Sequence, residues 1–400
     1  FDLTDLQNPL QIVMKKAEVE YIHHDFSAQD QTTKEASVRQ MIIEDRERPF
    51  DISKPGLWRL LTADVGNDMV VVLFVCHHAI IDGWSDATFS TELNNLYHQL
   101  ETAPDFVPTP LKSKYRDYVI NELVAKENQT ILDFWKNEFE DFQRNSFIFE
   151  LNDEGSESKV YNREFEPVLK EQLLNFANEQ HMSPKVVCLA VYLYVINRFS
   201  VSNDVTIGLH THNRPLHPDS QKVLGCFLNS IPFRYSIDEQ LTWKDYVGAV
   251  NEKFTDLTAF NNLSLMEISK LHSADKGAGF ENPFFDSLFA YLDFHVYQNL
   301  EHDESFSDAF GNEAVDASGQ GINNTFFNFI VNTTLDEFNL LIFYRSTQID
   351  DELIAHIADL FENSLKDLIG NPDGAINEQN SDTLQPGTEI EDEGEIEFDF

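Results

Sequence analysis

The chain has 400 residues, with 69 Asp and Glu against 28 Lys and Arg, and a formal net charge of −41. Hydrophobic residues make up 42%, including 33 phenylalanines, which is enough to fill a core and excludes a wholly disordered acidic protein. The charge argues against nucleic acid and anionic membrane as partners, because both would be repelled.

Several features bear on the compartment. The longest apolar runs, residues 69–76 and 186–196, are too short to span a bilayer. The first residues lack the basic segment that begins a signal peptide. The three cysteines, Cys76, Cys188 and Cys226, form no CxxC pair, and the first two lie in the apolar runs, which indicates buried thiols. We therefore expect a cytoplasmic protein in a reducing environment, with no membrane partner.

The first third of the chain mixes strand and helix patterns. Residues 17–24 partly alternate and favour a strand, whereas residues 33–48 are polar and compatible with a helix. The continuous β-branched run at 69–76 predicts a strand covered on both faces. Residues 115–142 are expected to be helical and largely solvated. A further helix is predicted after Trp84, because apolar residues fall on one helical face: Phe89, Leu93, Leu96, Tyr97 and Leu100.

A second unit is expected to begin near residue 145, and a turn-rich break follows at residues 152–158. Helices are predicted at 167–180 and at 184–199, the second behind an N-cap at Ser183. The last helix is expected to begin after Asp350, to present one apolar face and to end at Gly370. Five apolar stretches predict strands: 204–209, 231–236, 288–294, 325–331 and 338–344.

Two segments are strongly acidic. Residues 299–324 hold six acids and no Lys or Arg, and we expect a long loop there. Residues 374–400 hold nine acids and no Lys or Arg, which is typical of a disordered linker or tail. Its end, residues 395–400, alternates acidic and apolar side chains, so we expect a docking segment that adds a strand to a partner.

The sharpest chemical signal is the run HHAIIDGWS at residues 77–85, between a predicted strand and a predicted helix. A side chain at such a junction can leave the core while the backbone holds it in place. Histidine is the side chain best suited to proton transfer near neutral pH. An aspartate four residues later can orient the turn, and a glycine allows close backbone approach. The alternative reading is a capped strand end with two incidental histidines.

This run resembles the HHxxxDG signature of the condensation domains of nonribosomal peptide synthetases, and no DxxxxD replaces its histidines as in a cyclising variant. The similarity runs from about residue 8 to about residue 372. The family normally begins with a further helix and strand, so we expect the natural chain to start earlier. Further segments are similar to those of the family and follow in the same order: 48–52, 57–60, 114–118, 133–135, 207–215, 224–234 and 283–289.

The resemblance implies an α/β fold of two chloramphenicol-acetyltransferase-like lobes, arranged as a V-shaped pseudo-dimer with a central tunnel. Residues 1–144 would form the N-terminal lobe, with its start missing. Residues 145–373 would form the C-terminal lobe, and residues 374–400 an acidic linker or tail.

The resemblance also implies an acyltransferase that forms an amide bond. A donor peptidyl carrier protein would deliver an acyl or peptidyl thioester, and an acceptor carrier an aminoacyl thioester. No cofactor would be bound directly, because the phosphopantetheine arms belong to the carriers, and neighbouring synthetase domains would be further partners. Two alternatives stay open: an acyltransferase of this fold with a free small-molecule amine or alcohol acceptor, and a silent carrier-docking module.

By position in the signature, His78 is the active histidine that the resemblance implies, and His77 has a structural role. Asp82 is expected to pair with Arg214, and Gly83 to allow close approach. The oxyanion donor could be the backbone N–H of Gly83 or a side chain of the second lobe. Three residues are candidates for lining the tunnel: Trp84, Ser85 and Asn229.

Other histidine pairs have less specific patterns. His23 and His24 repeat the dipeptide without the Asp-Gly that follows in the signature. His210 and His212 can share one face of a strand, but no cysteine or carboxylate cluster completes a metal site. We therefore expect no metal.

Overall fold

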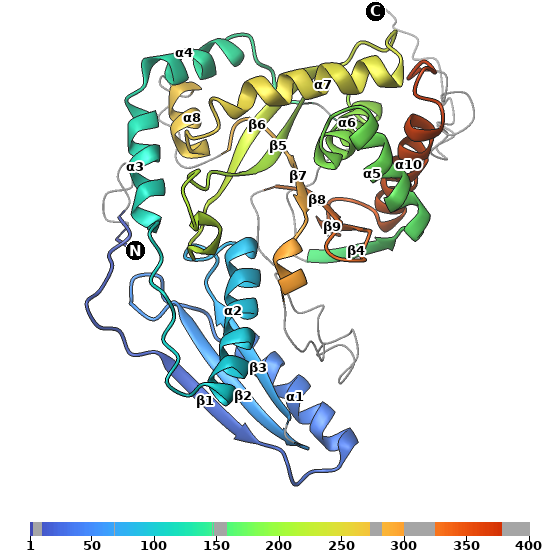
Figure 1. Cartoon of the computed structure of the whole chain (residues 1–400). Helices are drawn as coiled ribbons and strands as arrows, with labels where there is room; N and C mark the ends of the chain where they lie inside the picture. Colours follow the sequence, from blue (N-terminus) through green and yellow to red (C-terminus); the bar gives the residue numbers. More distant parts are fainter. Residues whose placement is uncertain are drawn as a thin grey trace, which may run out of the picture.

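The computed structural model contains two bodies, each built around one β-sheet (Figure 1). The small body holds a three-stranded sheet and the large body a six-stranded sheet, and both sheets mix parallel and antiparallel pairs. This is the mixed α/β class that the sequence predicts. The described residues are 1–2, 10–67, 69–145, 147, 158–272, 282–299 and 325–377.

The sheet of the small body has the order β1-β2-β3, in which β1 (Glu20–Asp25) runs parallel to β2 (Trp58–Gly66) and β2 antiparallel to β3 (Met69–Cys76). Helix α1 (Gln31–Arg46) covers one face with an apolar stripe that packs on the strands. The expectation that β3 is covered on both faces is wrong, because Val70 and Val72 are 55% and 49% exposed. Alternate β3 side chains point to opposite faces, and α1 covers one of these faces.

The sheet of the large body has the order β4-β9-β8-β7-β5-β6. Strand β7 pairs in parallel with β5 and β8, and the remaining pairs are antiparallel. The five strands that the sequence predicts are present within a few residues of their expected bounds, whereas the sequence patterns missed β2 and β4. The strands are β4 (Ser158–Glu164), β5 (Asp204–His212), β6 (Leu228–Ser236), β7 (Ser287–Leu292), β8 (Phe327–Asn332) and β9 (Asn339–Arg345).

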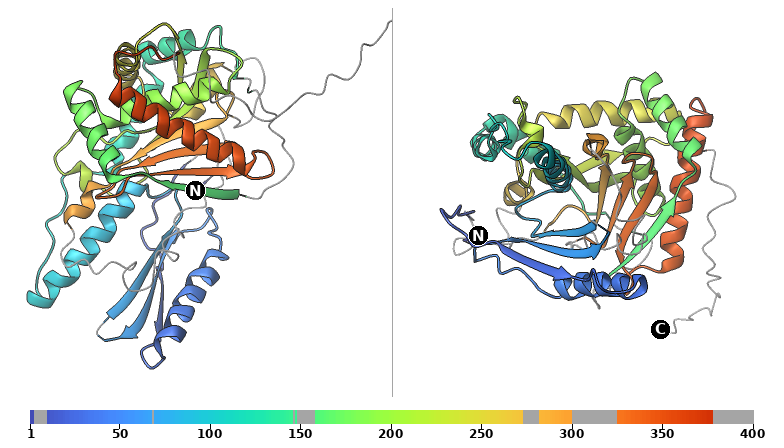
Figure 2. Two further views of the ribbon diagram at one scale, coloured as in Figure 1. Left: turned by 90° about the vertical axis from the view of Figure 1, so that its right-hand side faces the viewer. Right: turned by 60° about the horizontal axis from the view of Figure 1, so that its bottom comes forward.

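Helix α6 lies at the centre of the large body, where it packs on β5, β7 and three other helices. Its residues from Val186 to Asn197 are all buried, as expected for a helix that is apolar on every side. Figure 2 shows α10 lying along the large sheet, with its start capped by Asp350 as predicted. The helices of this body include α5 (Pro167–Glu179), α6 (Pro184–Arg198), α7 (Trp243–Thr258), α8 (Leu265–His272) and α10 (Asp351–Gly370), and two short 3-10 turns are η1 (Ser220–Lys222) and η2 (His295–Asn299).

The segment 115–142 forms two helices, α3 (Tyr115–Lys126) and α4 (Gln129–Glu138), rather than one solvated helix. The Asn128 side chain accepts a hydrogen bond from the Thr130 N–H and starts α4 anew. Trp135 and Phe139 are 1% and 3% exposed and pack in the core of the large body. The domain boundary at residue 144 stays a prediction.

The acidic tail begins later than predicted. The Gly374 carbonyl accepts a hydrogen bond from Trp243 N, and Ile376 N donates to the Leu241 carbonyl. The Ile376 side chain is fully buried in the core, so residues 374–377 belong to the fold. The rest of the tail, like residues 300–324 of the predicted loop, lies outside the described residues.

All three cysteines are free. Cys188 is buried as predicted, whereas Cys76 and Cys226 are partly exposed. Among the described helices, none combines the length and apolarity needed to cross a membrane.

We predict that Ile376→Ala lowers the free energy of unfolding by about 2–5 kcal/mol, because it leaves a cavity in the core. Urea denaturation followed by circular dichroism measures this change. Val201→Ala is the control, since Val201 is 70% exposed, and it should change stability little. Equal stability of the two variants would mean that residues 374–377 do not contribute to the core.

Candidate active site

The HHxxxDG run forms the turn between β3 and α2 (Gly83–Thr102). The His77 N–H donates to the Leu57 carbonyl (2.9 Å), and the His77 carbonyl accepts from the Ile80 N–H (3.0 Å). The Nδ1 atom of His77 also accepts from the Ala79 N–H at 3.1 Å. Backbone and ring of His77 therefore hold the turn together, as its expected structural role requires.

The next residue, His78, is exposed. Burial raises the pKa of Asp86 on α2, and the nearby His78 imidazole opposes this shift. Burial lowers the pKa of His210 on β5 to about 4, with further contributions from Lys185 and His78.

The turn that carries His78 is tied to both bodies, because the His77 N–H bonds to Leu57 beside β2 and the Asp82 N–H donates to the Gly225 carbonyl of the large body at 3.1 Å. The exposed imidazole therefore lies at the junction of the two bodies.

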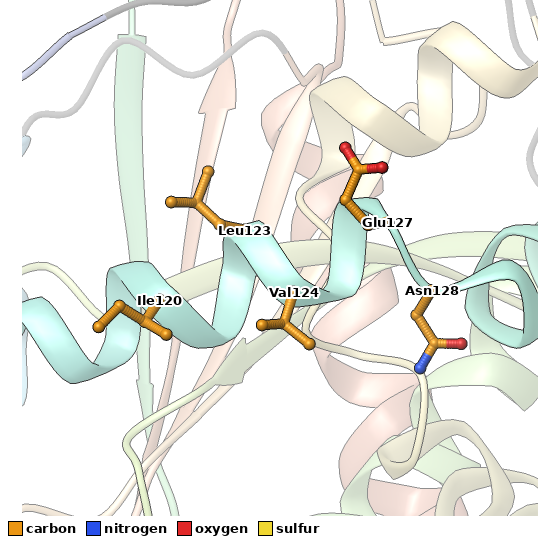
Figure 3. A pocket seen from close by; sticks show the side chains of 5 residues that line it. All are labelled: Ile120, Leu123, Val124, Glu127 and Asn128. Atoms are coloured by element: carbon orange, nitrogen blue, oxygen red, sulfur yellow. The ribbon is translucent and has the colours of Figure 1, made fainter.

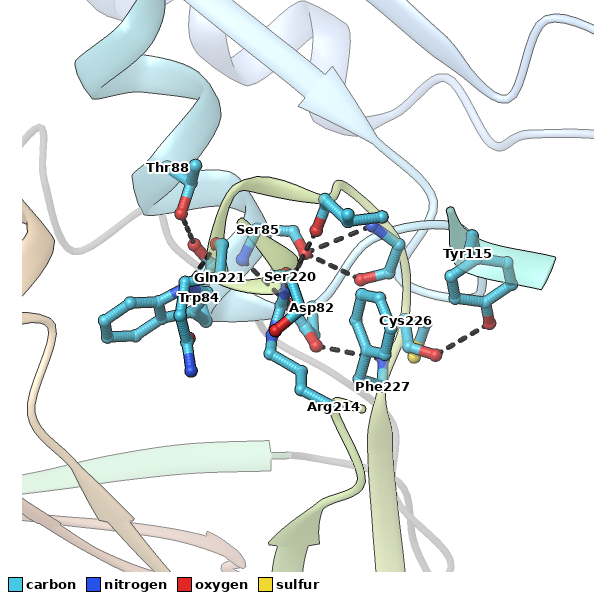
Figure 4. Close-up of polar contacts among 12 residues, drawn as sticks. Asp82, Trp84, Ser85, Thr88, Tyr115, Arg214, Ser220, Gln221, Cys226 and Phe227 are labelled. Carbon is cyan, nitrogen blue, oxygen red and sulfur yellow. Dashed lines mark hydrogen bonds and ion pairs between the residues drawn. The ribbon is translucent and has the colours of Figure 1, made fainter. Parts of the chain in front are cut away.

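Asp82 joins the two bodies through a buried set of contacts (Figure 4). Its carboxylate caps α2 by accepting from the Ser85 N–H (2.8 Å) and accepts from the Phe227 N–H (2.9 Å) just before β6. The Arg214 guanidinium lies 3.2 Å from Asp82 Oδ1, with both side chains at most 3% exposed. The predicted pairing of Asp82 with Arg214 is therefore present.

Arg214 and Ser85 complete this set. Arg214 also donates to the carbonyls of Ser220 (3.1 Å) and Val223 (2.7 Å) and to the Ser85 hydroxyl (2.6 Å). That hydroxyl in turn donates to the Gly225 carbonyl at 2.7 Å. Burial lowers the pKa of Arg214, and the Asp82 carboxylate opposes this shift. We call these residues the Asp82 network: Asp82, Ser85, Arg214, Gly225 and Phe227.

Two glycines permit close packing beside the network. A Cβ on Gly83 would lie 2.8 Å from the Phe294 ring, so the predicted close approach occurs and its partner is Phe294. A Cβ on Gly225 would lie 2.2 Å from the Tyr115 ring, whose hydroxyl donates to the Cys226 carbonyl at 2.8 Å. Gly225 lies in the segment 224–234 that resembles the family, but it was not predicted as a site residue, because only the tertiary contact with Tyr115 shows what requires a glycine there.

Two of the three candidates for tunnel lining are corrected by the structure. Ser85 has no exposed surface, and its hydroxyl is fully engaged in the Asp82 network. Asn229 is 9% exposed and donates to the carbonyls of Asn261 (2.9 Å) and Leu263 (2.8 Å), so it braces a loop.

Trp84, the third candidate, is partly exposed. Its indole N–H donates to the Gln221 carbonyl at 2.9 Å, and its ring centroid lies 4.8 Å from that of His295. These contacts do not test whether Trp84 lines a tunnel, so that role stays a prediction.

A separate surface depression lies on α3 and the turn that follows it, and Figure 3 shows its lining. It contains no member of the HHxxxDG run or of the Asp82 network. The lining residues are Ile120, Leu123, Val124, Glu127 and Asn128.

Lys185, the second residue of α6, was not singled out from the sequence, because a lysine in the first turn of a helix is usually solvated. Its amine instead donates to the His210 carbonyl at 2.8 Å, and burial lowers its pKa to about 8. Within the described part of the chain, no group of three or more His, Cys, Asp or Glu side chains could hold a metal ion.

We predict that Asp82→Ala destabilises the protein by about 3–5 kcal/mol, because Arg214 then keeps a buried charge without its partner. Denaturant unfolding measures the loss. Lys54→Ala is the control, since it removes an exposed ion pair with Asp51 and should have little effect. A folded Asp82→Ala variant with unchanged stability and activity would contradict a bracing role for the network.

Similarities to known proteins agree with this geometry. Residues 1–385 match the family described as Condensation domain. Bacitracin synthase 1 of Bacillus licheniformis is 25% identical over 83% of the chain and 6% of its own length. Gramicidin S synthase 2 of Brevibacillus brevis is 24% identical over 62% of the chain, and the match covers 6% of that relative. The chain thus spans a small fraction of these curated relatives.

Solved structures share the fold. The first condensation domain of the calcium-dependent antibiotic synthetase superposes with a TM-score of 0.67 at 17% identity, over 90% of this chain and 80% of the other. The epimerization domain from the third module of tyrocidine synthetase B gives a TM-score of 0.69 at 13% identity, over 89% and 80%. Since the family match covers nearly the whole chain, the protein belongs to the condensation domain family of nonribosomal peptide synthetases.

Proposed function

We propose that the protein forms an amide bond between a carrier-bound acyl or peptidyl thioester and a carrier-bound aminoacyl acceptor, with His78 as the active histidine. The observation that supports this most is the exposed His78 ring in an intact HHxxxDG turn, at the junction of two bodies that the Asp82 network holds together.

The reaction makes modest chemical demands. The acceptor amine attacks the thioester carbonyl, a C–N bond forms, the C–S bond breaks, and the thiol leaves with one proton. His78 accepts the proton that the attacking nitrogen loses and can return it to the departing sulfur, a role worth about 10²–10⁴-fold in rate. Holding the two reactants within reach contributes up to about 7–11 kcal/mol, so placement of His78 matters as much as its basicity.

The residues around His78 position its imidazole and take no part in the bond changes. His77 holds the turn through its ring nitrogen, and Gly83 lets α2 approach Phe294. Asp82 and Arg214 touch each other and the surrounding backbone, and we assign them as positioning residues. The oxyanion donor, either the Gly83 N–H or a side chain of the large body, stays a prediction.

The partners follow from the same proposal. Donor and acceptor peptidyl carrier proteins would present their phosphopantetheine thioesters from opposite mouths of a tunnel between the two lobes, with Trp84 as a lining residue. Neighbouring synthetase domains would supply these carriers. The curated relatives are many times longer than the segment that matches this chain, which supports such a multi-domain setting.

We predict that His78→Ala lowers amide formation by about 10²–10⁴-fold and leaves folding intact, because the side chain is exposed and its loss removes proton transfer. The measurement uses donor and acceptor carriers loaded with thioesters and follows the dipeptidyl carrier by mass spectrometry. His23→Ala, at an exposed position in another His-His pair, is the control and should keep the wild-type rate.

The molecule on which the amide forms distinguishes between the proposed function and its alternatives. Amide on the acceptor carrier supports the proposal, and amide on an added free amine alone would assign a small-molecule acceptor instead. Equal output from His78→Ala and the wild type would overturn the catalytic role and favour a docking module.

A further inference from the structure

The start of α2 is contacted by a second segment of the large body, which is separate from the Asp82 network. This segment comprises residues 294–299, which follow the end of β7 and include η2, and Figure 1 shows η2 beside α2. The network reaches Asp82 from residues 214–227, whereas residues 294–299 reach the helix from the end of β7. Two segments of the large body that are distant in sequence therefore meet at the start of α2.

Three contacts place the second segment along α2. The Phe294 ring packs on Gly83, the first residue of the helix. The His295 ring lies 4.8 Å, centroid to centroid, from the indole of the next helix residue. Farther along α2, the Asn95 side chain donates to the Asn299 carbonyl at 2.7 Å. The segment thus follows the helix from its first turn onward.

The contact between Phe294 and Gly83 is end-on. A Cβ on Gly83 would lie 2.8 Å from Cζ of the ring and 3.5 and 3.7 Å from Cε1 and Cε2, so the tip of the ring points at the glycine. The three atoms nearest to that Cβ all belong to Phe294. The ring therefore limits how closely the first turn of α2 can approach the large body.

Phe294 is itself held in place by the large body. Its N–H donates to the Thr334 hydroxyl at 3.1 Å, in the connection between β8 and β9. Its carbonyl accepts from the Tyr297 N–H at 3.1 Å, and the two rings pack edge to face with centroids 6.4 Å apart. Because its backbone is fixed relative to the large sheet, the Phe294 ring is a fixed stop for α2.

The position of the first turn of α2 determines where His78 lies. The HHxxxDG turn leads directly into α2, with Asp82 as the cap and Gly83 as the first helical residue. The backbone N–H of Gly83, a candidate oxyanion donor, moves with the same turn. A misplacement of about 1 Å in a reacting group can cost about 10²-fold in rate, so a contact that fixes this turn bears on catalysis.

We propose that Phe294 is a positioning residue of the condensation, whose ring sets the distance between the HHxxxDG turn and the large body through its contact with Gly83. This inference rests on the proposed function. Phe294 acts through the backbone of α2 and not on the substrate, so its loss should lower kcat more than it changes the KM for a carrier.

The test measures kcat and the KM for the acceptor carrier with carrier-bound thioesters, at equal concentrations of folded protein. We expect Phe294→Ala to lower kcat by about 10–100-fold, because the first turn of α2 loses its stop, and to leave KM within about twofold. Phe294→Tyr should lower kcat as well, since its added hydroxyl points at Gly83. Phe106→Tyr, at a position 37% exposed beyond the end of α2, is the control and should keep the wild-type kcat.

The tyrosine variant separates positioning from simple packing. A side chain that only filled space at the partly exposed position 294 would tolerate an added hydroxyl. Should Phe294→Ala fail to fold, Phe294→Leu, which lacks the tip of the ring, takes its place.

Gly83→Ala completes a double-mutant cycle with Phe294→Ala. Alanine is a better helix former than glycine, so the change should be harmless where the ring is absent. In the wild-type background the methyl group meets the ring, and kcat should fall by about tenfold or more. In the Phe294→Ala background the methyl group has space, and Gly83→Ala should change kcat little.

Wild-type kcat for Phe294→Ala or for Phe294→Tyr would overturn the inference and leave the proposed function standing. An effect of Gly83→Ala that is as large without the ring as with it would do the same. Absence of amide with the wild-type protein would instead remove the proposed function, and the inference with it.

Discussion

The contact between Asp82 and Arg214 is the constraint on which the arrangement of the site depends. One carboxylate caps α2, accepts from the backbone before β6 and pairs with a guanidinium that itself binds two carbonyls of the large body. All of these groups are buried, so each depends on the others for its hydrogen bonds. The HHxxxDG turn belongs to the small body, yet its aspartate is anchored in the large one. His78, four residues before Asp82, is thereby held in relation to both sheets.

The HHxxxDG turn combines a firmly held backbone with an exposed imidazole at His78. The His77 ring, the carboxylate that caps α2 and the Ser85 hydroxyl each form hydrogen bonds with backbone groups. At Gly83 and Gly225 the close packing leaves no room for a larger side chain. His78 alone among the turn's polar side chains is exposed, and no described residue hydrogen-bonds its ring. An imidazole that its neighbours hold in place, and whose ring nitrogens stay available, suits the proton-transfer role proposed for His78.

Local sequence patterns predicted the helices that have a clear N-cap and a regular arrangement of apolar residues. Helix α10 has one apolar face and a capping aspartate, and α6 has a serine cap and apolar residues on every side. Strand β2 was missed because Arg59 interrupts its apolar residues, and only the structure shows that Asp45 pairs with this arginine at 2.7 Å in the core. The break between α3 and α4 and the burial of Trp135 likewise depend on packing against the large body. The motif predicted His78 and its turn, but the function of the Ser85 hydroxyl depends on Gly225, which lies 140 residues away.

The fold alone does not select a reaction, since condensation and epimerization domains superpose on this chain about equally well. The exposed His78 imidazole in its intact turn, rather than the superposition, therefore supports the amide formation proposed for this chain.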